Sequence, residues 1–515
     1  MESWLLLLLS LFASTALFIL FFFSNKKKTI PLPPGPPSLP LIGSRLWLRH
    51  SVSDIEHLLK VLHLKYGPIF TLRIGSRDSI FIADRSLAHK ALVEHGAAFA
   101  DRPLPPPAIR FVNSNQHNIS SASYGPLWRL FRRNLTTEIL HPAKVRLFAP
   151  GRNWVLQVLL GELRTRSEES PDRSVVAMES FQFAMFCLLV LMCFGKKLDE
   201  KTIREIETAQ NRYLLYNRKL IIFSFVPRIA KYVFRGRLKT TMQLQQRQAN
   251  LFVPLIRARV EHKASSQKHS EGEMFAHSYL DSLLDIKLAE EGGRGLTENE
   301  MVTLCSEFLT GGTDTTATAL QWIMAELVEH QSIQAKLFEE IENVVAERGS
   351  DEEIKEEDLQ RMPYLRAVIM EGLRLHPPAH FVLPHAVTQD VQFEGYLIPK
   401  NASINFMVAL MGWDGRVWRE PKEFRPERFM AGGDGEDVDI TGSREIKMMP
   451  FGVGRRICPG LGLAMLHLEF FVANLVREFK WETVDGEKVD LTEKTKFTVV
   501  MEKPLRARIT PRKKH

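Results

Sequence analysis

The sequence is poor in cysteine and lacks any internal divider. Its only cysteines, Cys187, Cys193, Cys305 and Cys458, lie far apart in 515 residues. Their number and spacing argue against a disulfide framework and fit a reducing compartment. Length alone suggests two or three domains, but no low-complexity linker or internal repeat divides the chain. We therefore expect one large domain behind an N-terminal segment.

Charge clusters of the kind that bind nucleic acids are also missing. No prominent Lys/Arg cluster is interleaved with aromatic residues, which argues against a nucleic-acid partner. The formal net charge of +8 is modest for this length. It favours contact with an anionic membrane surface or an acidic protein partner. An ordinary solvated surface is the alternative.

The chain begins with a long apolar run. Residues 4–23 carry no charge over 20 positions, which is long enough for a helix to cross a bilayer. Three lysines follow at 26–28, whereas a cleaved signal peptide has its positive charges before a shorter apolar core. The positive-inside rule then places the N-terminus in the lumen and the rest in the cytosol. We predict a single-pass anchor of the endoplasmic reticulum membrane at 1–25, a basic and Pro-rich hinge at 26–41 and one large domain at 42–515.

Local patterns predict a mainly helical domain with small sheets. Residues 69–75 and 79–83 are short apolar or alternating runs around a polar turn, which indicates a hairpin. A long loop is expected at 102–125, where Pro, Asn and Ser are frequent and periodicity is absent. Further helices are expected at 86–94, 364–375 and 460–479. Successive helices are expected over about 142–289, with a buried core helix at 181–194 and a polar insert at 265–273. A small sheet is expected at 391–393 and 396–398, and a final hairpin at 494–501.

The densest motif surrounds Cys458. From Phe451 to Gly460 the spacing is Phe-x-x-Gly-x-Arg-x-Cys-x-Gly. Glycines let a loop turn tightly beside a large flat partner. The two preceding arginines and inward-pointing backbone N–H groups would stabilise a thiolate, which is a soft ligand suited to iron. A buried structural cysteine in a Gly-rich turn is the alternative, but so many spaced features favour a metal ligand.

A second motif lies inside a long predicted helix. The capping box formed by Thr297 and Glu300 opens this helix, which is expected to run to about Glu329. Its middle, residues 310–316, reads Thr-Gly-Gly-Thr-Asp-Thr-Thr and consists of poor helix formers. A weak stretch inside a long buried helix indicates a functional distortion. The alternative is a kinked helix whose threonines bond their own carbonyls.

Two further sets of residues that could bind charged groups stand out. Trp128 and Arg132 share one helix face, and an indole N–H beside a guanidinium can bind a carboxylate. A surface cation–π pair is the alternative. Glu371 and Arg374 form an i,i+3 pair, which is a weak signal by itself. It gains weight because Arg428, and then the Cys458 loop, follow it in order.

These ordered motifs resemble the cytochrome P450 family, in its plant microsomal A-type-like branch, over essentially the whole chain. The resemblance implies the cytochrome P450 fold, mainly α with small β-sheets, preceded by a single N-terminal transmembrane helix, with residues 42–515 as the catalytic domain. It implies haem b (iron protoporphyrin IX), with Cys458 as the axial iron ligand in the loop from Phe451 to Gly460. The propionate contacts implied are Trp128, Arg132, Arg456 and His385. A solvated strand-edge position is a competing interpretation of His385.

The resemblance also implies roles in oxygen chemistry. Thr315 would hydrogen-bond dioxygen, Asp314 would relay protons, and Gly311 and Gly312 would leave room beside the iron. Glu371, Arg374 and Arg428 would form a buried charged triad that frames the haem loop.

The implied reaction is the insertion of one oxygen atom from O₂ into a lipophilic small molecule. The chain has no Rossmann glycine fingerprint, so NADPH and flavins would act through a separate NADPH–cytochrome P450 reductase, with cytochrome b5 as a candidate second electron donor. Two alternatives stay open: a reductase-independent haem-thiolate isomerase or dehydratase, and a non-catalytic haem-binding scaffold or sensor. The intact Gly-Gly-x-Asp-Thr-Thr argues against the isomerase, which has no dioxygen to protonate.

Overall fold

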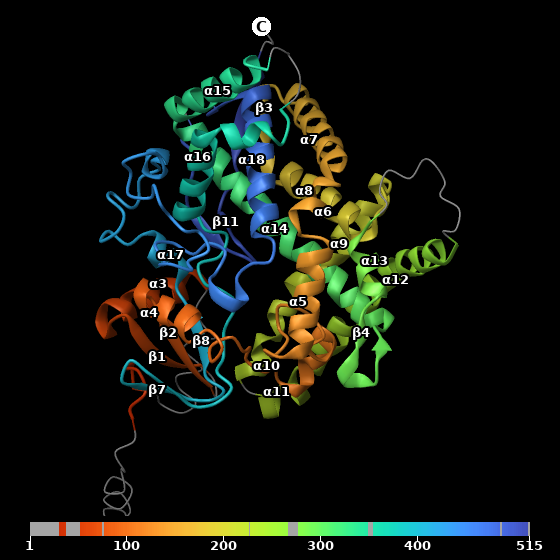
Figure 1. Ribbon diagram of the computed structural model, residues 1–515, viewed down its shortest axis with the longest axis vertical. Helices are drawn as coiled ribbons and strands as arrows, with labels where there is room; N and C mark the ends of the chain where they lie inside the picture. The colour runs from red at the N-terminus through yellow and green to blue at the C-terminus, as the bar shows by residue number, and fades with distance from the viewer. Residues whose placement is uncertain are drawn as a thin grey trace, which may run out of the picture.

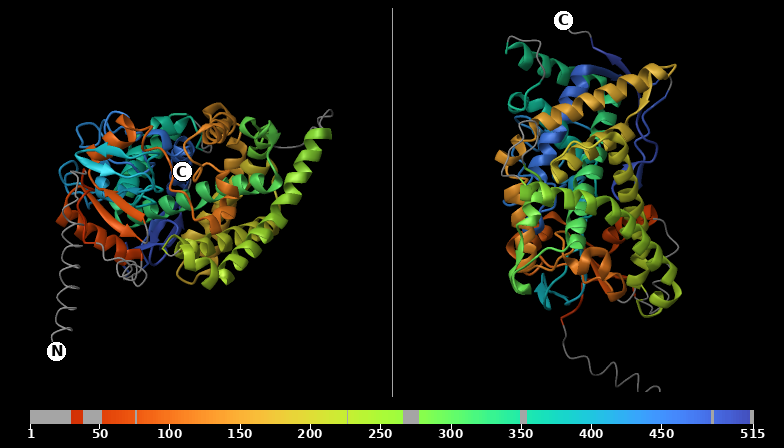
Figure 2. Two further views of the ribbon diagram at one scale, coloured as in Figure 1. Left: turned by 90° about the horizontal axis from the view of Figure 1, so that it is seen from below. Right: turned by 90° about the vertical axis from the view of Figure 1, so that its right-hand side faces the viewer.

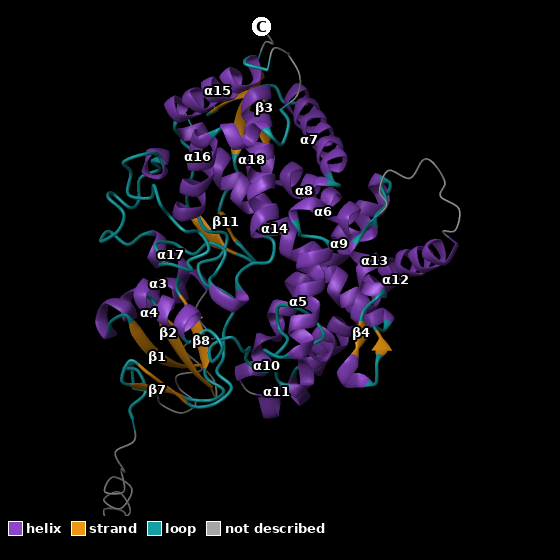
Figure 3. Ribbon diagram, in the orientation of Figure 1, coloured by secondary structure: helices purple, strands orange, loops and turns teal. Residues whose placement is uncertain are grey.

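Helices make up most of the chain, and the strands are short (Figure 3). The computed structural model describes residues 30–37, 52–74, 77–225, 227–265, 277–348, 354–484 and 487–512. The anchor predicted at 1–25, most of the hinge at 26–41 and nearly all of the polar insert at 265–273 lie outside the described residues. The prediction of a mainly α fold with small sheets is confirmed.

One small sheet lies near the start of the domain. Strands β1 (Ile69–Ile74) and β2 (Arg77–Ile82) form the predicted antiparallel hairpin. β2 also pairs in parallel with β8 (Ser403–Phe406), a strand from the other end of the domain. Helix α3 (Val52–Tyr66) packs beside this sheet (Figure 1).

The Pro-rich segment is attached to this sheet and to the two-stranded sheet of β6 (Val391–Phe393) and β7 (Tyr396–Ile398). The N–H of Thr71 donates to the carbonyl of Pro34, and that of Leu397 on β7 donates to Pro31, both at 2.8 Å. A Cβ at Gly35 would lie 2.0 Å from the carbonyl oxygen of Thr71, so only glycine allows this contact. The described residues 30–37, which belong to the predicted hinge, are therefore held against the domain at a defined position.

The long helix α14 (Glu298–Glu329) runs through the centre of the molecule (Figures 1 and 2). Both hydrogen bonds of its predicted capping box are present. It packs against α8 (Ala177–Phe194), α16 (Pro363–Leu375) and α18 (Leu461–Glu478). Among the described residues α8 is the one helix long and apolar enough to cross a membrane, but 89% of it is buried in the protein. The predicted core helix at 181–194 is thus confirmed.

The remaining elements surround this centre. The helices are α4 (Arg85–His89), α5 (Pro126–Glu138), α6 (Pro142–Arg146), α7 (Ala149–Glu169), α9 (Glu200–Asn217), α10 (Ile222–Phe225), α11 (Pro227–Val233), α12 (Arg235–Ser265), α13 (Tyr279–Leu284), α15 (Gln331–Ala346) and α17 (Val408–Gly412). The strands are β3 (Ser174–Val176), β4 (Lys287–Leu288), β5 (Arg294–Gly295), β6 (Val391–Phe393), β9 (Phe479–Glu482), β10 (Glu493–Thr495), β11 (Val499–Met501) and β12 (Arg506–Pro511). The small sheet β6–β7 and the final hairpin β10–β11 are as predicted.

Three local expectations are corrected. The helix expected at 86–94 changes from α4 to a π-helical turn at Lys90–Glu94. The loop expected at 102–125 contains a short 3₁₀ helix at Pro107–Gln116. The helical stretch at 142–289 is interrupted by β3, which pairs with β12 from the end of the chain, and by β4. Such a distant strand partner leaves no pattern in the local sequence.

Candidate active site

Cys458 lies in a tight loop that ends where α18 begins. Its backbone N–H donates to the carbonyl of Phe451 at 2.8 Å and closes the loop. Gly454 has a φ of +75°, and a Cβ there would lie 2.1 Å from the carbonyl oxygen of Leu92, so the loop requires glycine at this position. Burial raises the pKa of the Cys458 thiol, while the hydrogen bond from the Gly460 backbone and the charge of Arg132 oppose that rise.

The cation that acts on this thiol is not one of the two arginines that precede it. Arg455 donates to the hydroxyl of Tyr124. Arg456 donates to the carbonyls of Ala100 at 2.7 Å, Ile119 at 3.2 Å and Ala122 at 2.6 Å. The expectation that these neighbours stabilise the thiolate is therefore corrected, because both side chains are held by other segments.

Helix α5 carries Trp128 and Arg132 on one face, as expected. Trp128 is 7% exposed, and its indole Nε1 is buried without a hydrogen-bond partner among the described residues. The guanidinium of Arg456 lies 4.6 Å from the centre of the indole ring. Burial lowers the pKa of Arg132, and the nearby Cys458 sulfur opposes part of that shift. An unpaired buried N–H is costly, so this face is suited to a hydrogen-bond acceptor such as a carboxylate.

His385 is buried, at 3% exposure, which excludes the solvated strand-edge interpretation. It pairs with Ile404 in a β-bridge, and its Nδ1 lies 2.7 Å from the carbonyl oxygen of Phe99. Because a carbonyl only accepts, Nδ1 carries the proton in this contact. Burial, followed by the charge of Arg102, lowers the pKa of His385 to about 3. Binding a carboxylate through Nε2 would therefore require the imidazolium, which a nearby anion favours.

Arg102 is a buried cation that sequence reasoning missed. Its guanidinium donates to the carbonyls of Ser120, Leu383 and Pro384 at 2.7–2.9 Å. No salt bridge to Arg102 occurs among the described residues, and burial together with the charge of Arg456 lowers its pKa to about 9. Arg456 is half-buried, and the carboxylates of Asp101 and Glu307 offset only part of this shift, so the site suits a further anion. The only local signal was one charged pair, Asp101 and Arg102, at the start of the loop.

The middle of α14 has open space at Gly311. Gly311 is exposed although Leu309 and Thr313 on either side are buried, and a Cβ at Gly311 would meet nothing within 4 Å. Gly312 does not share this role, because a Cβ there would lie 2.5 Å from Leu189 of α8. The expectation that both glycines leave room for a ligand is thus corrected: Gly312 allows two helices to pack closely.

Thr315 and Asp314 lie next to this opening. The Thr315 hydroxyl donates to the carbonyl of Gly311 at 2.7 Å, and Asp314 accepts from Gln182 of α8 at 3.3 Å. Burial raises the pKa of Asp314. The helix continues through this stretch without interruption, so the expected distortion is absent and the threonine back-bond of the alternative interpretation is present.

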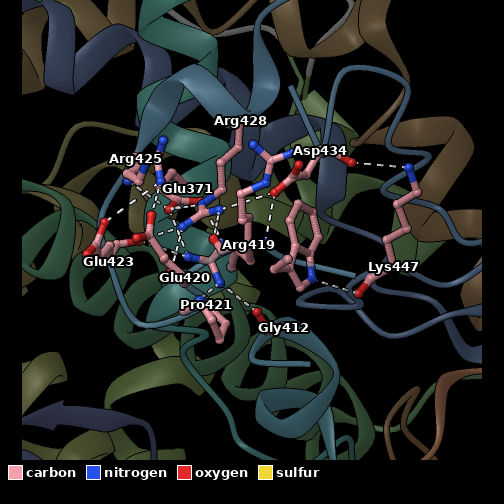
Figure 4. Close-up of polar contacts among 12 residues, drawn as sticks. Glu371, Gly412, Arg419, Glu420, Pro421, Glu423, Arg425, Arg428, Asp434 and Lys447 are labelled. Atoms are coloured by element: carbon pink, nitrogen blue, oxygen red, sulfur yellow. Dashed lines mark hydrogen bonds and ion pairs between the residues drawn. The ribbon is translucent and has the colours of Figure 1, made fainter. Parts of the chain in front are cut away.

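Glu371, Arg374 and Arg428 form a buried charged frame (Figure 4). Arg374 binds both oxygens of Glu371 at 2.6 and 2.8 Å, and Arg428 binds one of them at 3.1 Å. The carbonyls of Gly412 and Pro421 accept from Arg374 as well. The frame thereby fastens α16 to the segment that leads to the Cys458 loop.

These residues fit a flat cofactor that carries two carboxylates and one iron. No group of three or more His, Cys, Asp and Glu side chains in the described part of the chain could hold a bare metal ion. A haem needs only one thiolate from the protein, which Cys458 can supply. Its propionates would satisfy the unpaired indole N–H of Trp128 and interact favourably with the guanidinium charges of Arg102 and Arg456.

Comparison with known proteins agrees with this geometry. The cytochrome P450 family model matches residues 33–510. The chain is 46% identical to cytochrome P450 89A9 of Arabidopsis thaliana over 99% of this chain and 98% of that protein. It is 32% identical to flavonoid 3'-monooxygenase of the same plant, over 98% and 97% of the two chains. It is 30% identical to geraniol 8-hydroxylase of Catharanthus roseus, over 98% and 99%.

Solved structures share the fold. Retinoic acid bound cyanobacterial CYP120A1 superposes with a TM-score of 0.72 at 21% identity, over 94% of this chain and 100% of that chain. A zebrafish cytochrome P450 with progesterone gives a TM-score of 0.68 at 23% identity, over 89% and 99%. The match over nearly the whole chain, the similarity to plant enzymes and the common fold establish that this chain belongs to the cytochrome P450 family of monooxygenases.

Proposed function

We propose that this chain is a membrane-anchored haem-thiolate monooxygenase that oxidises a lipophilic small molecule. One observation carries the proposal: the half-buried Cys458 thiol lies just before α18, where the Gly460 backbone and the Arg132 guanidinium both favour the thiolate. A bound haem would supply the activation of dioxygen and the transfer of one oxygen atom. Cys458 would be its axial ligand.

The surrounding residues would hold the cofactor. Trp128 would donate its free indole N–H, and Arg132 its guanidinium, to a propionate. His385 as imidazolium would donate to a propionate as well. Arg102 and Arg456 already donate to backbone carbonyls, so they would act mainly through their charge.

Thr315 and Asp314 would control protons in the pocket. The Thr315 hydroxyl, which now donates to Gly311, can rotate about χ1 towards the open side of α14. Because its pKa is raised by burial, the Asp314 carboxyl can carry a proton closer to neutral pH than an exposed carboxyl. Gln182 holds that carboxyl on the α8 side of the helix.

We further propose the topology of the full chain: an anchor at 1–25 in the endoplasmic reticulum membrane with its N-terminus in the lumen, a hinge at 26–41 and a cytosolic catalytic domain at 42–515. The uncharged run at 4–23 and the lysines at 26–28 support it. Sequons at Asn118, Asn134 and Asn401 provide a test. A glycan on any of them would place the domain in the lumen and contradict this topology.

Electrons would come from NADPH through the separate NADPH–cytochrome P450 reductase, with cytochrome b5 as a second candidate donor. Arg129 and Arg133 are exposed on α5, beside the face that carries Arg132. These two side chains form a cationic surface near the thiol side of the protein, which suits an acidic partner.

The test uses the full-length protein in membranes with reductase and NADPH. Lipophilic compounds are first screened for a shift of the iron spin state, and compounds that shift it are incubated under ¹⁸O₂. A product with one ¹⁸O atom, formed only with NADPH, is expected. Turnover without NADPH, or a product without the label, would contradict the proposal and favour the isomerase or dehydratase.

A further inference from the structure

The hydroxyl of Thr310 differs from two other threonines of α14. Thr303 donates to the carbonyl four residues earlier at 3.0 Å, and Thr315 does the same at 2.7 Å. This back-bond is the usual fate of a helical threonine. Thr310 makes no such bond. Its hydroxyl oxygen accepts a hydrogen bond from Gln210 of α9, and its hydroxyl hydrogen has no acceptor among the described residues.

Gln210 is the reason for this difference. Its amide Nε2 donates to the carbonyl of Ser306 at 2.9 Å, which is the acceptor that Thr310 would otherwise use. The same amide group also reaches the hydroxyl of Thr310. The carbonyl is therefore occupied, and the Thr310 hydroxyl proton is left to point elsewhere.

A buried amide cluster holds Gln210 in place. Gln248 of α12 donates to the Gln210 carbonyl oxygen and to the Ser306 hydroxyl at 3.0 Å, and Ser306 donates back to Gln210 at 3.2 Å. Gln210 and Gln248 are 3% and 2% exposed. A buried polar cluster that is fully bonded stabilises one arrangement. The orientation of Thr310 is consequently set by α9 and α12.

Thr310 directly precedes Gly311, the position of α14 that has open space beside it. It is half-buried, and the next residue, Gly311, is the exposed one with open space at its Cβ position. Thr310 and Thr315 are five positions apart, so their backbones are about 7.5 Å apart along the helix axis. A hydroxyl that itself accepts a hydrogen bond is also a stronger donor.

We propose that the Thr310 hydroxyl is a specificity-determining donor, and that the substrate is a lipophilic molecule with a hydrogen-bond acceptor oxygen, such as a carbonyl, ether or hydroxyl. The inference rests on the proposed function and narrows its substrate class. Sites built to bond a polar group reject analogues that lack it far more strongly than apolar pockets reject a missing methylene. Gln210 is the positioning residue for this donor.

The test uses ligands that bind the haem iron, so the natural substrate does not need to be known. 1-Phenylimidazole and its 2-, 3- and 4-acetyl derivatives bind through the imidazole nitrogen to the haem iron and project a ketone to different distances. Dissociation constants are measured from the imidazole-induced spectral shift of the full-length holoprotein. In the wild type, one acetyl derivative is expected to bind about tenfold more tightly than the parent compound, the effect of one hydrogen bond.

Variants test whether the tighter binding of the acetyl derivative depends on Thr310. Thr310→Val should abolish it and leave the affinity for 1-phenylimidazole unchanged, whereas Thr310→Ser should retain it. Thr303→Val is the matched control, because the Thr303 hydroxyl is already bonded to Asn299; the gain should persist. Gln210→Leu should reduce the gain, since Thr310 could then donate to Ser306.

The negative results distinguish a wrong Thr310 assignment from a wrong proposed function. If no acetyl derivative binds more tightly than the parent compound, or if Thr310→Val keeps the gain, the Thr310 assignment is wrong. If even 1-phenylimidazole produces no shift in the wild type, the haem-thiolate function itself fails.

Discussion

The guanidinium of Arg132 on α5 acts on the thiol of Cys458 and lowers its pKa, opposing the effect of burial. Arg456, only two residues from Cys458, instead donates to three backbone carbonyls. The side-chain charge that acts on the thiol thus comes from a helix in the first third of the chain, in addition to the larger effect of the Gly460 backbone. This electrostatic interaction also links the proposed iron ligand to the proposed propionate site, because Trp128 lies on the same face of α5 as Arg132.

Replacing the proposed iron ligand should remove the spectral signature of the thiolate. We expect Cys458→Ser to lose the red-shifted Soret band of the reduced carbon monoxide complex, because a serine oxygen donates less charge to iron than a thiolate. Difference spectra of the purified variant measure this. Cys187→Ala, a buried cysteine on α8, should keep the band. Survival of the band in Cys458→Ser would refute the whole assignment.

Removing the free indole N–H of Trp128 should weaken haem retention. Trp128→Phe keeps an aromatic ring but deletes the unpaired donor together with part of the indole, and the Trp154 control accounts for the smaller ring. A hydrogen bond to a charged acceptor contributes about 1.5–3 kcal/mol, so haem transfer to excess apomyoglobin should become at least about tenfold more favourable. Trp154→Phe on α7 is the control and should not change transfer. Equal transfer for both variants would mean that Trp128 has no cofactor contact.

Breaking the buried frame should prevent folding of the holoprotein. Arg374→Ala leaves the fully buried carboxylate of Glu371 with one arginine instead of two, and the loss of a buried partner costs roughly 3–5 kcal/mol. Haem content per protein and thermal unfolding measure the effect. Arg366→Ala on the same helix breaks an exposed pair with Glu469 and should cost less than about 1 kcal/mol. Normal haem occupancy in Arg374→Ala would exclude a framing role.

Deleting the Thr315 hydroxyl should uncouple NADPH use from product formation. Thr315→Ala removes the proposed proton donor beside Gly311, so reduced oxygen would leave as peroxide more often. The ratio of product to NADPH consumed should fall severalfold at a similar rate of NADPH oxidation. Thr315→Ser keeps the hydroxyl and should restore most of the ratio. An unchanged ratio in Thr315→Ala would exclude Thr315 from proton delivery.

A buried histidine links three distant segments and should make stability depend on pH. His380 lies 2.7 Å from Glu56 of α3 and 3.5 Å from Glu493 of β10. Thr495, also on β10, donates to Glu56 at 2.8 Å. Burial alone would lower the pKa of His380, but the two carboxylates outweigh it and raise the pKa to about 9.

Because the folded-state pKa of His380 is above its unfolded value of about 6.5, its contribution to stability is complete below pH 6.5. The contribution is lost as pH rises through about 9. The free energy of unfolding should therefore decline over this range by up to about 3 kcal/mol. Denaturant unfolding of the wild type and of His380→Gln at several pH values measures this. The decline should be smaller in His380→Gln, and parallel curves would contradict the ion-pair interpretation.

Several elements were predictable because their signals are local. The capping box of Thr297 and Glu300 marks the start of α14, and alternation marks the hairpin β1–β2. The glycines, arginines and Cys458 in one short stretch predicted the site loop. The element bounds were less accurate wherever a distant strand intervened, as at β3, whose partner β12 lies at the end of the chain.

The sequence by itself determined the family, the helix that carries Thr315, and Cys458 as the candidate ligand, because periodicity, caps and motif spacing are properties of neighbouring residues. The tertiary structure decided which cation acts on Cys458, that Gly312 serves packing, and that Gln210 frees the hydroxyl of Thr310. It also decided that Arg102 is buried with no ion pair in the described part of the chain. Each of these depends on contacts between segments far apart in the chain. The physical reason is that burial and hydrogen-bond partners across helices are set by packing, which leaves no periodic signal in either segment.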